Sequence, residues 1–264
     1  MRCSALLRDR KAVVGMIHLP PLPGSTNYDG MPLDSIVQGA VADACALSEA
    51  GFDAAILQNT HDLPATATAP VETIAFLAAI GRELRHETFP NMALGVNVLK
   101  NDAEGALAVA AAIGALFVRL KVFVGAAVGA EGLLVASAPA ALRMRQRLGS
   151  DTELWVDLFD RTSAPLVPQP LSQLAEWVMK FGDSSAVIVT GTSIAESIQM
   201  VREVRGVAPQ LPVVIGGGVT EASVMDALLD ADGVIVGSAL EQRPFTGPIS
   251  REKAASFVRA ARGQ

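Results

Sequence analysis

Eight short runs of apolar, largely β-branched residues recur along the chain, and each precedes a longer Ala- and Leu-rich segment of helical period. We interpret the runs as strands at Val13–His18, Ala54–Gln58, Ala93–Leu99, Leu116–Val122, Leu154–Leu158, Ala186–Thr190, Val213–Gly216 and Val234–Gly237. Each step between strand ends is long enough for a helix and a right-handed crossover to a parallel neighbour. The alternation therefore predicts an α/β protein built on a parallel sheet.

Eight consecutive units favour a single closed (β/α)₈ TIM barrel over an open doubly wound sheet. An open sheet this wide usually carries a visible break or an antiparallel edge, and the chain of 264 residues has the length of one barrel. No tract rich in Pro, Gly and Ser separates two halves. We therefore predict one TIM-barrel domain over residues 1–264, with its core at 13–261.

Capping residues mark the expected ends of several helices. A polar residue precedes the segment, and glycine follows it, at Asp34 before Ser35–Ala50 with Gly51, Asp102 before Ala103–Ile113 with Gly114, and Ser193 before Ile194–Arg205 with Gly206. The last helix is expected at Arg251–Ala261.

Composition excludes several classes of protein. The chain is 50% hydrophobic and 18% charged, which excludes a disordered or fibrous protein and requires a large core. The net charge of −6, without a basic run, argues against nucleic acid as a partner. Cys3 and Cys45 cannot form a disulfide framework, which indicates a reducing compartment. Without a signal peptide or a long uncharged apolar segment, we expect no membrane insertion and a cytoplasmic location.

A polar residue lies near the end of each of six predicted strands. In each strand it falls on the same face as the small or apolar residues that we expect deeper inside the barrel. The six polar residues are His18, Gln58, Asn97, Lys121, Asp157 and Thr190. Side chains alternate along a strand, so this shared face would bring all six to the mouth of the barrel. Convergent polar groups at an apolar barrel's mouth are typical of a catalytic pocket. The alternative is that they satisfy one another and the loop backbone.

We assign candidate roles to these side chains. Asp157 and Lys121 lie on adjacent strands and could form an ion pair, with Asp157 as a general base and Lys121 stabilising negative charge or, as an alternative, forming a Schiff base. His18 could act as an acid, a base or a metal ligand. The candidate substrate-binding residues are Gln58, Asn59, Asn97, Arg119, Thr190, Gly191 and Thr192.

Two glycine-containing turns follow the last two strands, in the segments VVIGGGVT (213–220) and GVIVGSAL (233–240). Loops after the seventh and eighth strands form the recurring phosphate site of TIM barrels, where backbone N–H groups at helix starts hold the anion. Glycine also occurs in short turns for steric reasons alone. We predict phosphate binding by Gly217, Gly218, Val219, Thr220, Gly237 and Ser238.

No cofactor is predicted. The three glycines at 216–218 lack the context of a dinucleotide-binding motif. A divalent metal could bind to His18, to the pair His61-Asp62 or to Asp157 with Asp160. None of these residues shows the tight sequence spacing of metal ligands. We therefore assign no metal-binding residue.

Several segments together resemble the BtpA family, named for a photosystem I biogenesis protein and including SgcQ-like proteins. They are GMIHLPPLPGS (15–25), GVNVLKNDAEGALAVAAAIGA (95–115), RLKVFVGAAVGAEGLL (119–134), Ala164-Pro165-Leu166, IGGGVT (215–220) and ADGVIVGSAL (231–240). The match extends from Val13 to about Leu240. It implies a TIM barrel similar to the phosphate-binding barrels of ribulose-phosphate and tryptophan-biosynthesis enzymes.

The resemblance supports pocket or loop-shaping roles for His18, Asn59, Asp62, Asn97, Asn101, Asp102, Arg119, Gly125, Asp157, Gly191, Gly217, Gly218, Gly237 and Ser238. The chain departs from the family pattern at Gln58, Lys121 and 159–162, where acids, bases and amides are exchanged for one another.

Two functions follow. The first is an enzyme acting on a phosphorylated small molecule, either a sugar phosphate or a nucleotide-derived compound, by isomerase, lyase or hydrolase chemistry. The second is a non-catalytic assembly or stability factor of the photosystem I biogenesis type. A homo-oligomer is compatible with both.

Overall fold

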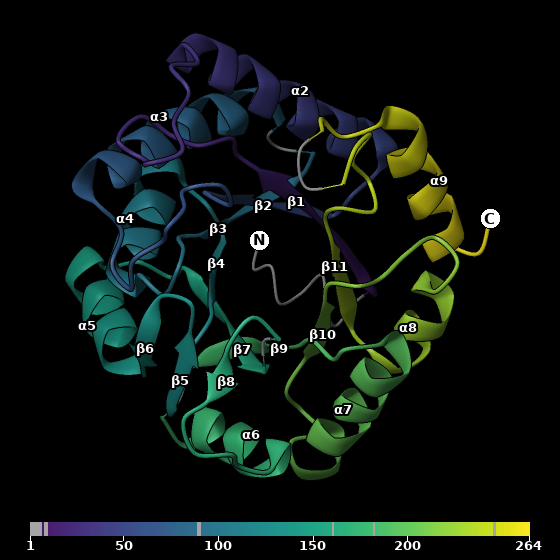
Figure 1. The fold of residues 1–264 in the computed structure, drawn as a ribbon. Helices are drawn as coiled ribbons and strands as arrows, with labels where there is room; N and C mark the ends of the chain where they lie inside the picture. Colours follow the sequence, from purple (N-terminus) through teal and green to yellow (C-terminus); the bar gives the residue numbers. More distant parts are fainter. Residues whose placement is uncertain (1–6, 8–9, 89–90, 160, 182, 245–246) are drawn as a thin grey trace.

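Eight parallel strands close into a barrel in the computed structural model, which describes residues 7, 10–88, 91–159, 161–181, 183–244 and 247–264. Around the barrel, neighbouring strands follow the order β1 (Ala12–His18), β11 (Gly233–Val236), β10 (Val213–Gly216), β9 (Ser184–Val189), β7 (Glu153–Phe159), β4 (Phe117–Leu120), β3 (Ala93–Asn97) and β2 (Ala54–Gln58). The parallel pairing of β1 with β11, which sets Ala12 opposite Gly233, closes the ring. The predicted TIM-barrel fold is confirmed (Figure 1).

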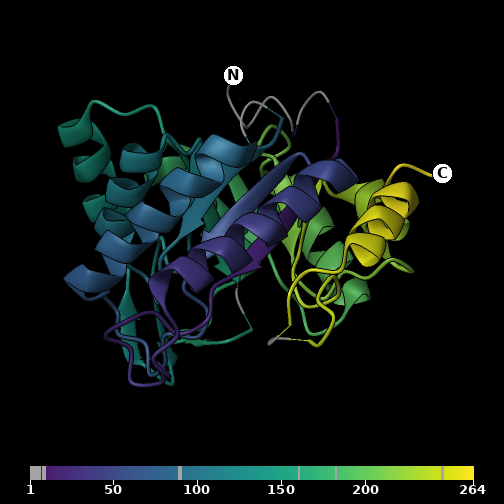
Figure 2. The same cartoon turned by 90° about the horizontal axis from the view of Figure 1, so that it is seen from above.

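Helices surround the barrel (Figure 1). They are α2 (Leu33–Ala50), α3 (Val71–Thr88), α4 (Ala103–Ile113), α5 (Ala138–Leu148), α6 (Leu171–Phe181), α7 (Ile194–Val207), α8 (Val224–Asp230) and α9 (Arg251–Ala261). Figure 2 shows the loop after β1 and the segment after β4 protruding from the same end of the barrel. We call this end, formed by the carboxyl ends of the strands, the mouth. Within the described residues, no helix is both long and apolar enough to cross a bilayer.

The cap predictions are correct for α4. The Asp102 side chain accepts a hydrogen bond from the Gly105 amide at 2.8 Å, and Gly114 ends the helix in the left-handed conformation. Ser193 likewise caps α7 by accepting from the Glu196 amide.

Two other boundary predictions are wrong. Helix α2 begins two residues earlier than predicted, at Leu33, with Pro32 as its N-cap. Asp34 lies in the first turn, where the positive end of the helix dipole stabilises its carboxylate. Helix α7 continues through Gly206 to Val207, because an isolated glycine weakens a helix without ending it.

Side-chain alternation divides the core into two apolar layers. The inner layer fills the barrel with Leu7, Ala12, Val14, Met16, Ala54, Ile56, Phe117, Trp155, Ala186, Ile188, Val214 and Ile235. The Phe117 and Trp155 rings stack there with centroids 4.2 Å apart. The prediction of which strand residues face the inside of the barrel is therefore correct. The inward-facing residues that follow this layer along each strand lie toward the mouth.

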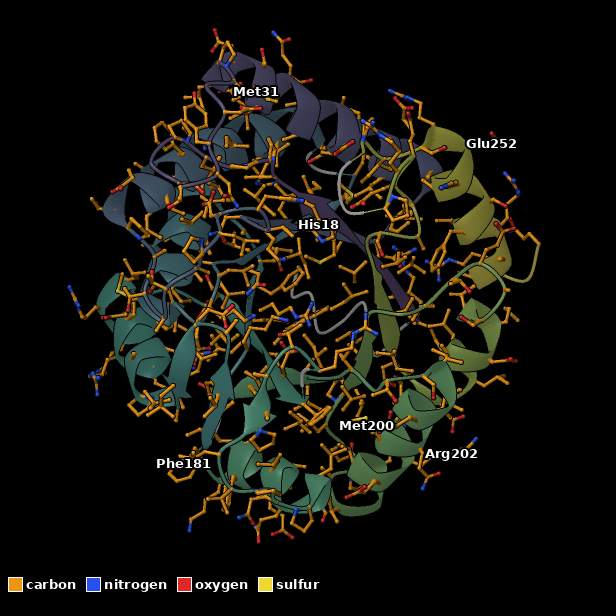
Figure 3. All side chains as sticks on the ribbon, viewed as in Figure 1. His18, Met31, Phe181, Met200, Arg202 and Glu252 are labelled. Atoms are coloured by element: carbon orange, nitrogen blue, oxygen red, sulfur yellow. The ribbon has the colours of Figure 1, made fainter. Side chains whose placement is uncertain are left out.

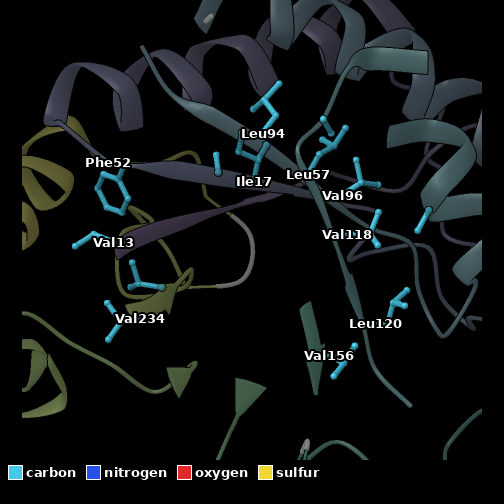
Figure 4. Packing of buried hydrophobic residues seen from close by; sticks show 14 of the residues in the cluster. Val13, Ile17, Phe52, Leu57, Leu94, Val96, Val118, Leu120, Val156 and Val234 are labelled. Atoms are coloured by element: carbon cyan, nitrogen blue, oxygen red, sulfur yellow. The ribbon is translucent and has the colours of Figure 1, made fainter. Parts of the chain in front are cut away.

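Figure 3 shows the result for β1: His18 lies inside the ring of helices, whereas Met31, Phe181 and Arg202 lie toward its periphery. The outer apolar layer lies between the strands and the helices, and Figure 4 shows part of it, including Ile17 of β1 and Val118 of β4. The two layers leave polar side chains at the ends of the strands.

A small antiparallel sheet beside the mouth was not predicted. It consists of β5 (Ala126–Gly129), β6 (Gly132–Val135) and β8 (Ala164–Pro165), in the order β6-β5-β8. Strand β4 is also shorter than predicted, so Lys121 lies just beyond its end. The connection after β4 thus forms a hairpin before α5 begins.

Candidate functional site

A cavity of about 370 Å³ opens at the mouth of the barrel. Its lining includes all six predicted phosphate-binding residues, Gly217, Gly218, Val219, Thr220, Gly237 and Ser238. It also includes five residues from four other strand ends, namely His18, Gln58, Arg119, Lys121 and Thr190. We call this space the mouth cavity. The barrel thus brings the two glycine turns together with side chains that are far apart in the sequence.

The backbone of the two turns depends on glycine in different ways. Gly217 and Gly218 have φ values of +114° and +74°, which L side chains rarely adopt. At Gly237 the constraint is space, because a Cβ there would lie 2.7 Å from Cε1 of His18. The first turn is therefore shaped by backbone conformation, and the second allows the His18 imidazole to lie against the main chain.

The predicted helix starts at these turns are wrong. Helix α8 has only seven residues and begins at Val224, and the amide of Thr220 donates to the Ser223 hydroxyl. After β11 the chain forms a turn, closed by the Leu240 amide donating to the Gly237 carbonyl, and α9 begins only at Arg251. An anion here would meet turn backbone rather than helix ends.

The mouth cavity has a cationic lining. Arg119, Lys121 and Arg161 all border it, and no Asp or Glu does so among the described residues. Arg161 comes from the loop after β7, and its Nη1 lies 3.9 Å from the position a Cβ would take at Gly218. Arg161 was not predicted as a site residue, although its position directly after a strand is typical of residues at a barrel mouth.

Asp157 anchors two of these cations. Its carboxylate accepts from Nε and Nη2 of Arg119 at 3.2 and 3.0 Å, and Lys121 Nζ lies 3.6 Å from Oδ2. The Asp157 side chain is fully buried, and it borders a separate space of about 60 Å³ rather than the mouth cavity. The predicted proximity of Asp157 and Lys121 is correct, but Arg119 is the closer partner.

His18 is held by an acidic residue that the sequence analysis missed. Its Nδ1 lies 2.7 Å from Oε1 of Glu241, which is buried in the segment after β11. The opposite edge of the ring faces Gly237, since Nε2 lies 3.2 Å from the position a Cβ would take there. The imidazole is thus oriented on one side by a carboxylate and faces the second glycine turn on the other.

Besides Arg119, two of the predicted substrate-binding side chains line the mouth cavity while hydrogen-bonded within the protein. Gln58 donates from Nε2 to the Thr60 hydroxyl at 3.0 Å, and the Thr190 hydroxyl donates to the Gly216 carbonyl at 2.6 Å. Thr190 therefore braces the first glycine turn.

Four others lie outside that lining. Asn59 accepts from the Leu99 amide, and Asn97 donates from Nδ2 to the Arg119 carbonyl, both at 2.8 Å. The Gly191 amide donates to the Ser197 hydroxyl, and the Thr192 amide donates to the Glu196 carboxylate. These contacts correspond to the structural alternative, in which polar groups at strand ends hold loops and helix starts in place.

The residues considered for a metal that the structure describes do not form a cluster. Across the described part of the chain, no three His, Cys, Asp or Glu side chains are arranged to hold an ion. Burial lowers the pKa of His61 and raises that of Asp62, whose Oδ1 accepts from the Leu22 amide at 2.8 Å. Asp160 and Cys3 lie outside the described residues.

Solved structures with this architecture cover nearly the whole chain. A chain of M. tuberculosis tryptophan synthase superposes with a TM-score of 0.62 and 20% identity, with 99% of each chain covered. Thiamine phosphate pyrophosphorylase from Pyrococcus furiosus gives 0.60 and 15%, covering 97% of this chain and 98% of that one. A phosphoribosyl anthranilate isomerase in complex with a reduced deoxyribulose 5-phosphate compound gives 0.55 and 15%, covering 96% and 99%. These likenesses concern the fold.

Proteins that match in sequence are more similar to this chain than these solved structures are. An uncharacterized protein of Thermococcus kodakarensis is 32% identical over 257 residues, which are 96% of each chain. The photosystem I biogenesis protein BtpA of Synechocystis is 31% identical over 234 residues, covering 87% of this chain and 80% of that one. The BtpA family model matches residues 9–263. The chain therefore belongs to the BtpA family.

Proposed function

We propose that this protein is an enzyme that binds a phosphorylated small molecule, a sugar phosphate or a nucleotide-derived compound, in the mouth cavity. The observation that carries the proposal is the composition of that cavity, in which two glycine turns and three cationic side chains meet without an acidic residue among the described lining. A dianionic phosphate group is stabilised by main-chain N–H groups and by Arg or Lys side chains. Gly217–Thr220 and Gly237-Ser238 form the phosphate site, and Arg161 adds a cation to it.

In this proposal His18, and not Asp157, is the residue that transfers a proton to or from the ligand. The Glu241 carboxylate orients His18 at Nδ1, and Nε2 faces the turn that would hold the phosphate. This arrangement suits proton transfer to or from a ligand, as in isomerase, lyase or hydrolase reactions. Asp157 is engaged by Arg119 and acts as a positioning residue, which holds Arg119 and Lys121 where negative charge would develop.

Calorimetric titration with inorganic phosphate and ribose 5-phosphate tests the binding site. In Gly218→Val the ligand can no longer approach the backbone closely. The affinity for both ligands should therefore fall at least about tenfold, the effect of losing one hydrogen bond to a charged group. Gly132→Val is the matched control, because Gly132 also has positive φ and open space around it but lies in the β5–β6 turn. Unchanged affinity in a folded Gly218→Val would contradict the phosphate site.

Phosphorus NMR of a panel of phosphorylated metabolites incubated with the protein tests catalysis. We expect conversion of at least one compound, and a rate about 10²–10⁴-fold lower in His18→Asn, the usual contribution of a general acid or base. Binding without conversion of any panel member would count against the enzyme.

A second function is favoured by the small sheet beside the mouth. Leu133 and Val135 of β6, and Val167 just after β8, are 54%, 60% and 64% exposed. Exposed apolar residues on one sheet are typical of a surface that contacts another protein, as a non-catalytic assembly or stability factor requires. Leu133→Glu combined with Val135→Glu should then abolish partner binding in pull-down assays and leave phosphate binding unchanged.

A further inference from the structure

A second cavity, of about 310 Å³, adjoins the mouth cavity. The two share Met16 and His18 as lining residues, so the imidazole stands between them. The lining of the second cavity includes His18, Met31 and residues of α2. Figure 3 shows His18 inside the ring of helices and Met31 toward its periphery. We call this second cavity the side cavity. A ligand that extends across both cavities would therefore contact His18.

The two cavities differ in charge. The side cavity is bordered by the carboxylates of Asp43 and Glu241 and, among the described residues, by no Arg or Lys. The mouth cavity has the reverse composition. A carboxylate accepts hydrogen bonds and attracts N–H donors, whereas a cationic lining attracts phosphate. The pair of cavities therefore suits a molecule with a phosphate at one end and N–H donors at the other.

Most of the remaining side-cavity wall is apolar. Leu19, Pro20, Ile36, Pro248 and Ile249 contribute to it. Apolar walls with a few placed polar groups are typical of pockets that bind ring compounds. At the polar end, the Asp43 carboxylate accepts from the Ile249 amide at 2.8 Å, which fixes its position against the wall. Burial raises the pKa of Asp43, which is consistent with an acid held in a largely apolar surrounding.

A glycine inside helix α2 borders the side cavity. Gly39 lies within α2 and borders the cavity, and no heavy atom lies within 4 Å of where its Cβ would be. Glycine inside a helix is unfavourable relative to alanine. Gly39 is exposed and no neighbour packs against it, so a larger side chain at this position can extend into the cavity that Gly39 borders.

We propose that the ligand is nucleotide-like: a phosphorylated compound whose other end is an apolar ring carrying N–H donors, bound in the side cavity. This inference rests on the proposed function and narrows it, because a simple sugar phosphate would leave the side cavity empty. The ring's N–H groups donate to Asp43 or Glu241, the phosphate occupies the glycine turns, and His18 faces the atoms between them.

Calorimetric titration of the wild type with matched ligands tests the inference. The ligands are inorganic phosphate, ribose 5-phosphate, AMP, GMP, CMP and aminoimidazole carboxamide ribonucleotide, the last four of which carry amino-bearing rings. We expect at least one of these four to bind at least about tenfold more tightly than ribose 5-phosphate. Gly39→Leu should remove that advantage while leaving ribose 5-phosphate within about twofold.

Gly206→Leu is the control, since Gly206 is also a helix glycine with open space around it but borders neither cavity. It should preserve the preference. Equal affinity for ribose 5-phosphate and all four ring compounds, or a preference that survives Gly39→Leu, overturns the inference and leaves the phosphate site standing. No binding of any phosphorylated ligand, inorganic phosphate included, overturns the proposed function itself.

Discussion

Each end of the barrel holds a buried carboxylate between two cations, but the two clusters serve different purposes. At the amino ends of the strands, Asp53 receives Arg262 at 2.7 Å and Arg10 at 2.6 Å, and it also accepts from the Val13 amide. At the mouth, Asp157 receives Arg119 and Lys121. The cations of Asp53 reach it from segments far apart in the sequence and are partly exposed, whereas those of Asp157 are nearly buried and border a cavity.

The comparison teaches that an ion pair does not identify a site by itself. Asp53 ties the strand start, the segment before it and the end of α9 together, which is a contribution to stability. Asp157 holds Arg119 and Lys121 beside an open cavity, as the proposed phosphate site requires. The surroundings of the cations distinguish a cluster that stabilises the fold from one that borders a candidate binding site.

The largest expected effect comes from Asp157→Asn. The variant leaves Arg119 buried without its carboxylate, and breaking a buried pair in this way costs about 3–5 kcal/mol of the free energy of unfolding. Urea denaturation of wild type and variant measures the difference. A loss below about 1 kcal/mol, the range of exposed ion pairs, would mean that water reaches the Arg119–Asp157 pair freely.

A smaller loss is expected at the opposite end. Asp53→Asn keeps an acceptor for the Val13 amide, and its arginine partners can turn toward solvent, so we expect a cost of about 1–3 kcal/mol. Phosphate affinity should stay the same, because Asp53 lies at the other end of the strands from the mouth cavity. If phosphate binding weakened in this variant, the separation of the two ends would be contradicted.

Two exposed arginines sharpen the contrast further. Arg161→Ala at the mouth should weaken phosphate binding about threefold to tenfold, a charged hydrogen bond discounted for exposure, and leave stability unchanged. Arg10→Ala should do the reverse, with a stability loss of at most about 1 kcal/mol and normal phosphate affinity. Calorimetric titration and urea denaturation of both variants provide the test, and equal effects on affinity would erase the distinction.

The smallest expected effect is a difference in pH dependence. Burial raises the pKa of Asp43 above its unfolded value, so the folded protein holds that proton more tightly, and stability falls as the pH rises from about 4 through the raised pKa. Asp43→Asn should lose less stability across this window than the wild type.

The opposite sign is expected at Asp230, where the hydrogen bond from Arg202 lowers the pKa. There the stabilising contribution is present above the unfolded pKa and disappears as the pH falls through the lowered one. Asp230→Asn should therefore differ from the wild type at neutral pH and approach it in acid. Thermal unfolding between pH 3 and 8 measures both variants, and parallel curves would contradict these assignments.

Periodicity was sufficient to predict the barrel and much of its mouth. The strand parity that placed apolar residues in the lumen also placed His18 and Lys121 at the mouth cavity, because alternation along a strand is a local property. It brought Asp157 close to Lys121, but Asp157 borders a separate space. The partner of His18 could not be found this way. Glu241 lies in an irregular segment after β11, where no period relates its position to β1.

The sequence pattern also could not predict which of two neighbouring cations pairs more closely with Asp157. Arg119 and Lys121 share one face, but only the folded geometry shows that the Arg119 guanidinium takes both oxygens of Asp157. The β5–β6 hairpin is a different omission, since the glycines at 129 and 132 flanking a two-residue turn were visible in the sequence.

The pairing of β1 with β11 has a consequence for how the chain reaches its native state. A closed ring has no strand edge, but this ring closes by joining Ala12–Gly15 to Gly233–Val236, segments separated by most of the chain. Until that join forms, both strands present unpaired N–H and C=O groups that a second unfinished chain can bind. Because such distant pairings form slowly, the yield on refolding should fall with protein concentration even where the finished barrel does not self-associate.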